Sequence, residues 1–324
     1  MSEQIYPYAV SKIRVKELNI LTKHELDNMA DEENMTKIKS TLSDKGYNFD
    51  IIDKIEDFET VLKNESIKLY ALIKELIPDS KFANIFLCKN DYHNAKLILK
   101  AKIVGKDYEE SLVDAGIIEV SKLIDNIENS DYSDLSEYMQ EGITEIKNYP
   151  DYEKKPYIID CKLDAKSFEE MKQIAKDAKC EFIVNYVEKL IDITNLRTFF
   201  RVLRNHNKDK NIFEESFING GTIDKEVFLE SFDMDLQDSK LKNKIKEEIF
   251  NSAITNPKAF DSFCDNYIME YMKESKFKAL TIEPIVAYIY AKETEIKNVR
   301  ILLTGKINNI NPKIIKERLR NSYV

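Results

Sequence analysis

The chain has 324 residues, a hydrophobic fraction of 43% and a formal net charge of −9. This length allows two or three domains with cores of their own, and this apolar fraction excludes a disordered chain. The excess of acid argues against a general nucleic-acid binder, which needs a net basic face. The chain has only seven glycines and seven prolines, about a third of average usage. Turns and hairpins depend on these residues, so we expect an all-α fold.

The N-terminal stretch "MSEQIYPYAV" has no basic region followed by a long apolar run, so the sequence predicts no signal peptide. No segment approaches 18 consecutive apolar residues, and we expect no membrane-spanning helix. The four cysteines form no CxxC pair and are expected to be buried hydrophobic residues in a reducing compartment. The expected location is cytoplasmic, with attachment to a membrane component left open.

Helix signals occur along the whole chain. Capping boxes at Thr22–Glu25 and Ser167–Glu170 predict the starts of two helices, and Gly46 is expected to end a helix that runs through Ile38 and Leu42. A helix of about 20 residues is predicted near the C-terminus, with Pro284 in its first turn. Its apolar stripe is Ile282, Ile285, Ile289, Ile296, Val299 and Leu303.

One six-residue pattern occurs three times: an acid, two residues, Asn, an apolar residue, then Lys or Arg. The copies are "DYHNAK", "DITNLR" and "EIKNVR", and their acids are 101 and 103 residues apart. The motif residues are Asp91, Asn94 and Lys96; Asp192, Asn195 and Arg197; and Glu295, Asn298 and Arg300. The first two copies are followed by "EESLVDAGIIEVSKLI" and "EESFINGGTIDKEVFL", which share Glu-Glu-Ser, a Gly, an Ile and a further helix. The repeat predicts an internal duplication.

Three similar helical domains follow from this repeat and from breaks near Pro78, Pro150 to Pro156 and Pro257. The predicted domains are 1–62 together with 280–324, then 63–165, then 166–279. The C-terminal piece is too short to stand alone, so it is expected to pack with the N-terminal piece and close the chain on itself.

On a helix, the acid and the Asn of each copy share a face, whereas the base points about 140° away from the acid. We therefore hypothesise a polar latch. In it Asn94, Asn195 and Asn298 bond to backbone at a helix junction, and the three bases meet acids on a neighbouring domain. The alternative is that these are solvent-exposed charges kept by descent from a common ancestor.

Motifs for catalysis are not found, so the sequence predicts no catalytic, cofactor-binding or metal-binding residue. Gly105-Lys106 and Gly305-Lys306 lack the upstream glycine and the hydroxyl of a phosphate loop. The three histidines, His24, His93 and His206, are too far apart in sequence to form a paired zinc motif. The acidic run "DIIDKIED" lacks the aspartate cluster of a prenyl-chain enzyme and is expected to be a solvated face.

Two stretches carry a family resemblance: "YPYAVSKIRVKELNILTKHEL" at the start and "DYHNAKLILKAKIVGKDYEESLVDAG" after residue 90. They resemble the C subunit of V-type and archaeal-type rotary ATPases, the eukaryotic d subunit. The resemblance covers nearly the whole chain. The chain departs from thermophilic members of the family in having only seven arginines.

The resemblance implies a non-catalytic, funnel-shaped subunit of three similar domains about a pseudo-three-fold axis. It implies a cytoplasmic place against the membrane, between the D- and F-type central-shaft subunits and the proteolipid ring. There the protein would transmit torque for ATP-linked proton or sodium transport without binding a nucleotide or nucleic acid. A helical-repeat adaptor protein and an all-α enzyme with an unrecognised site remain alternatives. The sequence does not distinguish protons from sodium ions, nor synthesis from hydrolysis.

Overall fold

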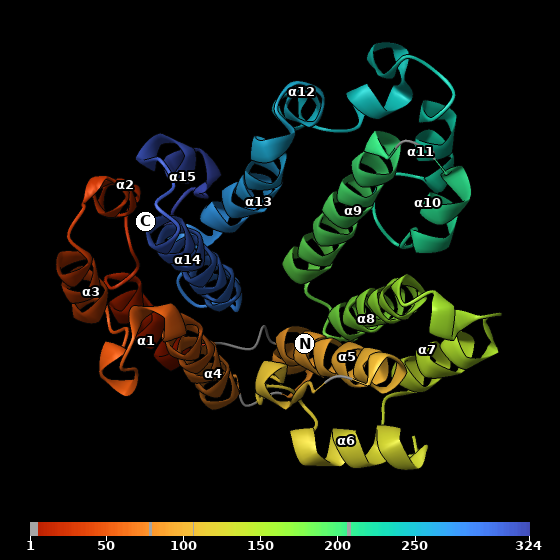
Figure 1. The fold of residues 1–324 in the computed structure, drawn as a ribbon, viewed down its shortest axis with the longest axis horizontal. Coiled ribbons are helices and arrows are strands. Elements are labelled where there is room, and N and C mark those ends of the chain that lie inside the picture. The colour runs from red at the N-terminus through yellow and green to blue at the C-terminus, as the bar shows by residue number, and fades with distance from the viewer. Residues whose placement is uncertain (1–5, 78–79, 106, 206–208) are drawn as a thin grey trace. The chain divides into compact units, whose positions relative to one another are not determined.

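The structure is a computed structural model that describes residues 6–77, 80–105, 107–205 and 209–324, without the side chains of 80, 81 and 110. Within these ranges the chain forms fifteen α-helices and seven short 3-10 helices, and no strand (Figure 1). The predicted all-α class is therefore confirmed. Contacts divide the chain into two compact units. The first is Met1–Leu76 with Glu247–Val324, and the second is Ile77–Lys246.

The first compact unit combines both ends of the chain. In Figure 1 the N-terminal helices, coloured red to orange, lie beside the blue C-terminal helices α14 and α15. Its helices are α1 (Pro7–Glu17), α2 (Lys23–Asp31), α3 (Met35–Asp44), α4 (Phe58–Leu76), α12 (Glu247–Thr255), α13 (Pro257–Lys273), α14 (Glu283–Ile307) and α15 (Pro312–Arg318). The 3-10 turns η1 (Phe49–Ile51), η2 (Ile55–Asp57) and η7 (Glu274–Phe277) connect them.

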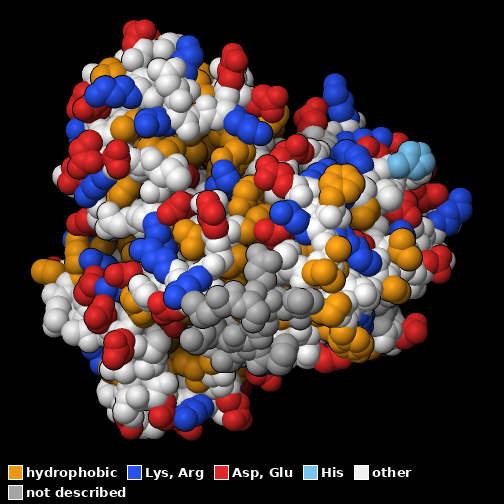
Figure 2. Space-filling model, turned by 180° about the vertical axis from the view of Figure 1, so that it is seen from behind, with side chains coloured by type: hydrophobic (Ala, Val, Ile, Leu, Met, Phe, Trp, Pro, Cys, Tyr) orange, Lys and Arg blue, Asp and Glu red, His pale blue; other side chains and the backbone are white. Residues whose placement is uncertain are grey.

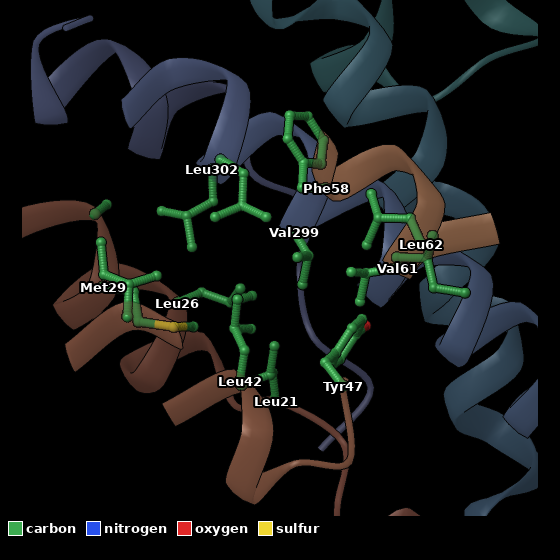
Figure 3. Packing of buried hydrophobic residues seen from close by; sticks show 14 of the residues in the cluster. Leu21, Leu26, Met29, Leu42, Tyr47, Phe58, Val61, Leu62, Val299 and Leu302 are labelled. Atoms are coloured by element: carbon green, nitrogen blue, oxygen red, sulfur yellow. The ribbon is translucent and has the colours of Figure 1, made fainter. Parts of the chain in front are cut away.

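One hydrophobic core holds the two ends of this unit together. Leu21, Leu26 and Leu42 from the N-terminal segment pack in the same cluster as Val299 and Leu302 from α14 (Figure 3). All five side chains are almost fully buried. Because each buried aliphatic side chain contributes about 1.5–3 kcal/mol, this shared core stabilises the N- and C-terminal segments as one body. The expected packing of the C-terminal piece against the N-terminal piece is present here.

The second compact unit contains two cores. Its helices are α5 (Ser80–Val104), α6 (Val120–Asn129), α7 (Glu137–Asn148), α8 (Tyr157–Asp177), α9 (Glu181–Arg204), α10 (Lys210–Ser216) and α11 (Lys225–Ser231), with 3-10 turns η3 (Glu109–Ser111), η4 (Tyr152–Lys154), η5 (Leu236–Asp238) and η6 (Lys240–Asn243). Aliphatic side chains of α5 to α8, such as Ile98, Ile143 and Leu163, form one core. Phenylalanine rings form the other, where Phe199 of α9 lies against Phe213 of α10 and Phe228 of α11.

Several local predictions can be compared with this fold. The Thr22–Glu25 capping box begins α2. Five residues of the predicted stripe are buried in α14 and the sixth, Ile282, is buried at its N-cap, so both predictions are confirmed. The helix through Ile38 and Leu42 ends at Asp44, and Gly46 follows it with a φ of 98°. The capping box predicted at Ser167–Glu170 is wrong, because Ser167 lies in the middle of α8. There the apolar face continues through Leu163 and Met171, and its burial outweighs the local capping signal.

The surface mixes charges of both signs. Figure 2 shows acidic and basic side chains interspersed over the visible face, with hydrophobic side chains between them. No helix in the described ranges is both long and apolar enough to cross a membrane.

Candidate functional site

Each of the three motif asparagines makes the same pair of hydrogen bonds to backbone. In the first copy, on α5, the Asn94 amide nitrogen donates to the Val113 carbonyl and its oxygen accepts from the Val113 N–H, both at 2.9 Å. Asn195 on α9 holds Ile218 in the same way, at 2.8 and 2.9 Å. Asn298 on α14 holds Arg320, at 3.1 and 2.8 Å.

This two-bond contact satisfies a donor and an acceptor that would otherwise be buried without partners. All three asparagines are at most 1% exposed. A buried polar group without a partner costs about 1–3 kcal/mol, so each amide fixes its loop in one register against the long helix. The geometry is the one that the latch hypothesis describes for the three amides.

The motif acids hold the next part of the same loops. Asp91 accepts from the N–H groups of Ile117 and Ile118, at 2.9 and 3.2 Å. Asp192 accepts from the N–H groups of Thr222 and Ile223, at 2.8 and 3.1 Å, and from the Thr222 hydroxyl at 2.6 Å. Burial raises the pKa of Asp192 even though these hydrogen bonds oppose the shift.

In the first two copies the acid accepts a hydrogen bond from the residue immediately before the N-cap of the following helix. The N-cap position of α6 is Glu119, directly after Ile118, and that of α11 is Asp224, directly after Ile223. Asparagine and acid together therefore orient a whole loop and the start of the next helix.

The third copy is completed by the other end of the chain. Glu295 accepts from the N–H of Leu21, which directly precedes Thr22, the N-cap of α2. The Ser322 hydroxyl donates to the Leu21 carbonyl, next to the loop that Asn298 holds. The two ends of the chain thus supply together what a single continuous loop supplies in the other copies.

Two glycines make room for the carboxylates. A Cβ atom on Gly116 would lie 1.9 Å from an Asp91 oxygen, and a Cβ on Gly221 would lie 2.2 Å from an Asp192 oxygen. Both distances are far inside van der Waals contact, so these positions require glycine for as long as the acid stays in place. The shared Gly of the two flanking sequences is the sequence signal for this contact.

Two motif bases form ion pairs between long helices. Lys96 on α5 bonds to Asp164 on α8. Arg300 on α14 binds Glu59 on α4 through two nitrogens, at 2.8 to 3.1 Å. The hypothesis placed these acids on a neighbouring domain, but each lies in the same predicted domain as its base. Since each base points away from the acid of its own copy, it reaches a neighbouring long helix instead, α8 for Lys96 and α4 for Arg300. Arg197 has the corresponding place on α9 and is partly buried.

A buried charged cluster next to the third copy was missed from the sequence. Lys292 pairs with Glu295 at 2.6 Å and lies 3.6 Å from Glu65, and the Tyr47 hydroxyl donates to Glu295 at 2.9 Å. All four side chains are at most 9% exposed. Burial and the two carboxylates raise the pKa of Tyr47, so it stays a neutral donor. The available signal was Glu65, a charged residue on the apolar face of α4.

No group of three His, Cys, Asp or Glu side chains in the described ranges is arranged to hold a metal ion. His206 lies outside the described residues, as do Pro78 and Lys106. The four cysteines are free.

The comparison with protein families decides what this fold is. A model described as ATP synthase (C/AC39) subunit matches residues 9–318. The chain belongs to this family. The match spans all three motif copies and the helices between them.

Curated relatives of this C/AC39 chain match over nearly its full length. It is 25% identical to the C subunit of the V-type sodium ATPase of Enterococcus hirae, over 96% of this chain and 97% of the relative. It is 26% identical to the C subunit of the A-type ATP synthase of Methanocaldococcus jannaschii, over 97% and 86% of the two chains. A third relative, the C subunit of the A-type ATP synthase of Thermococcus kodakarensis, is 21% identical over 96% and 89%. The predicted family is therefore confirmed.

Proposed function

We propose that this chain is a non-catalytic central-stalk subunit of a rotary V-type ATPase or ATP synthase. It couples the central-shaft subunits to the membrane proteolipid ring and carries torque for ATP-linked proton or sodium transport. The observation that carries the proposal is the family match over residues 9–318, together with full-length relatives that are named as C subunits of such enzymes. In this role the chain is peripheral to the cell membrane on its cytoplasmic side.

The latches support a torque-transmitting role for the chain. A part that transmits torque must not yield at the junctions between its helices. Each motif fixes one such junction with buried hydrogen bonds from a long helix. These hydrogen bonds break only when the helix or the loop unfolds locally.

The domain division is part of this proposal. The predicted boundary at 62/63 falls inside α4, and that at 165/166 falls inside α8. We place the boundaries at the ends of these helices instead, so that each repeat runs from a motif-bearing helix to the long helix that closes it. The third repeat then joins the C-terminal segment to the N-terminal helices through α4, as the bond between Glu295 and Leu21 indicates.

The test is to remove this chain from the enzyme and restore it. Membrane vesicles from cells that lack the chain should lose ATP-driven ion transport, and adding the purified chain back should recover it. The purified chain alone should hydrolyse no ATP. Undiminished transport without the chain would contradict the proposal. If a tagged chain brought down none of the ATPase subunits, the helical-repeat adaptor would be the better account.

A further inference from the structure

The most exposed large hydrophobic side chains in the described ranges gather on one surface of the first compact unit. Phe277 is 95% exposed, Leu18 78%, Tyr8 70% and Val15 67%, whereas no such side chain elsewhere exceeds 55%. Leu280, at 51%, lies with them. We call these five residues the α1 patch. Single exposed hydrophobic residues are ordinary, but a cluster of the most exposed ones indicates an interaction surface.

Hydrogen bonds hold the two parts of the patch together. The Tyr6 N–H donates to the Leu280 carbonyl at 2.9 Å. The Arg14 guanidinium donates to the carbonyls of Lys276 and Lys278, at 2.6 and 3.0 Å. The loop after α13 is therefore fixed beside α1, and the patch is formed before any partner arrives.

The α1 part of the patch has the spacing of a helix-binding face. Tyr8 and Val15 of α1 and its C-cap residue Leu18 fall on one side of the helix, opposite its buried residues Val10 and Ile13. They span ten residues, or roughly 15 Å of helix. Anchors three or seven residues apart are the pattern by which a helix packs against another helix or a groove.

Basic side chains without carboxylate partners border the patch. No carboxylate in the described ranges lies within ion-pair distance of Lys16 or Lys276. Lys16 also lines a pocket of about 210 Å³ whose other charged residues are Lys45, Lys68, Lys292 and one carboxylate, Glu65. Lys45, Lys68 and Lys292 each pair with a carboxylate, so the charge that this pocket offers to a partner is that of Lys16.

We propose that the α1 patch docks a partner protein subunit that presents an apolar helix face with an acidic side chain beside it. The partner's apolar residues would cover Val15, Leu18 and Phe277, and its carboxylate would meet Lys16 at the pocket. This inference rests on the proposed function, because the partner is taken to be another subunit of the rotary enzyme.

Two other occupants are disfavoured by charge. An anionic bilayer would be repelled by the net charge of −9 of the chain. A second copy of the chain would bring the same unpaired lysines against one another in a two-fold contact.

The experiment compares tagged variants purified from membranes of the native host. Leu18→Glu combined with Phe277→Glu should lower the ATPase subunits recovered per tagged chain by about tenfold or more. The matched control is Ile254→Glu, an exposed apolar residue of α12 in the same compact unit, which should change recovery less than about twofold. Circular dichroism and thermal melting of the purified chains should be unaltered, because all the substituted side chains are exposed.

A charge arm tests the acidic partner. Lys16→Glu should weaken recovery and reduce its dependence on salt, whereas Lys313→Glu, at an exposed lysine of α15, should do neither. Undiminished recovery of the Leu18/Phe277 variant would overturn the proposal. The proposal would also be overturned if the wild-type chain self-associated and this variant did not. The same holds if the wild-type chain floated with phosphatidylglycerol vesicles and this variant did not. If the wild-type chain itself recovers no ATPase subunit, the proposed function fails first.

Discussion

The motif asparagines act by satisfying backbone groups that no other group reaches. Replacing Asn94, Asn195 or Asn298 by Ala leaves one N–H and one C=O without a partner in a buried place. At about 1–3 kcal/mol for each of the two groups, each variant should lose about 2–6 kcal/mol of unfolding free energy. Urea unfolding followed by circular dichroism measures this loss. The control is Asn308→Ala, because the Asn308 side chain is exposed and its amide makes one hydrogen bond, to the Thr304 carbonyl. A control as destabilised as the latch variants would contradict this account.

The carboxylate oxygens of the two motif aspartates accept different sets of hydrogen bonds, so replacement by Asn should change stability by different amounts at the two positions. In Asp91 each oxygen accepts a backbone N–H, so Asp91→Asn sets an amide N–H₂ against an N–H. We expect that variant to lose about 1–3 kcal/mol. In Asp192 one oxygen accepts both N–H groups and the other faces the Thr222 hydroxyl, which can turn and accept instead. Asp192→Asn should therefore be nearly neutral in urea unfolding.

The pH dependence of Asp192 gives a second readout. Burial raises its pKa in the folded chain above the ordinary value of 3.8. At a pH between 3.8 and this raised pKa, Asp192 is ionised in the unfolded chain and protonated in the folded chain. The wild-type chain should therefore lose stability as the pH rises through this window, relative to Asp192→Asn. Unfolding in urea at a series of pH values measures the difference. A wild-type chain that gains stability over the variant with rising pH would contradict the sign.

At the scale of elements, α5 and the loop that follows it pack closely because Gly116 has no side chain at the point where the Asp91 carboxylate lies. In Gly116→Ala the new Cβ would occupy the place of an Asp91 oxygen, so the whole carboxylate must move and release the N–H groups of Ile117 and Ile118. We expect a loss of about 1–3 kcal/mol. In an Asp91→Ala background the carboxylate is already gone, so the same glycine substitution should cost less by about 1–2 kcal/mol. Additive losses in the double variant would show that the two residues do not interact.

The sequence predicted some of these elements better than others, for physical reasons. The long helix α14 was predictable because six apolar residues repeat on one face. The motif was visible because the same acid and asparagine recur. Ser167 misled because a capping box is a local signal, whereas the helix around it is set by the core it contacts. The contact between Glu65 and Lys292 could not be derived, because it joins helices far apart in sequence through tertiary packing.

The glycine contacts lie between these cases. Gly116 and Gly221 were seen as a shared feature of the flanking sequences, but their closeness to the acids was not. Asn94 holds a residue 19 positions later and Asn195 one 23 positions later. In both copies, however, the first N–H that the acid holds comes four residues after that point. The two contact points within the loop are therefore always four residues apart, whereas the number of residues between the asparagine and the loop differs between the copies. Sequence spacing alone did not reveal the contact for this reason.

At the scale of the whole molecule, the first compact unit is closed by contacts between the two ends of the chain. Leu21 bonds to Glu295, and Arg300 binds Glu59. The hydrophobic core beneath these polar contacts takes residues from both ends as well. Neither segment buries its apolar face without the other, so we expect both segments to unfold together and separately from the second compact unit.

Hydrogen exchange in the intact chain tests this coupling. Leu26→Ala removes a fully buried side chain of α2 and should cost about 2–5 kcal/mol. If the two ends form one cooperative body, amides of α14 should exchange about thirtyfold faster or more, along with those of α2. Amides of α5 and α6 should keep their protection. Ile143→Ala, in the core of the second compact unit, should give the reverse pattern. Acceleration confined to α2 and α3 in the Leu26 variant would mean that the ends of the chain are held together only loosely, and that the third motif copy does not join them.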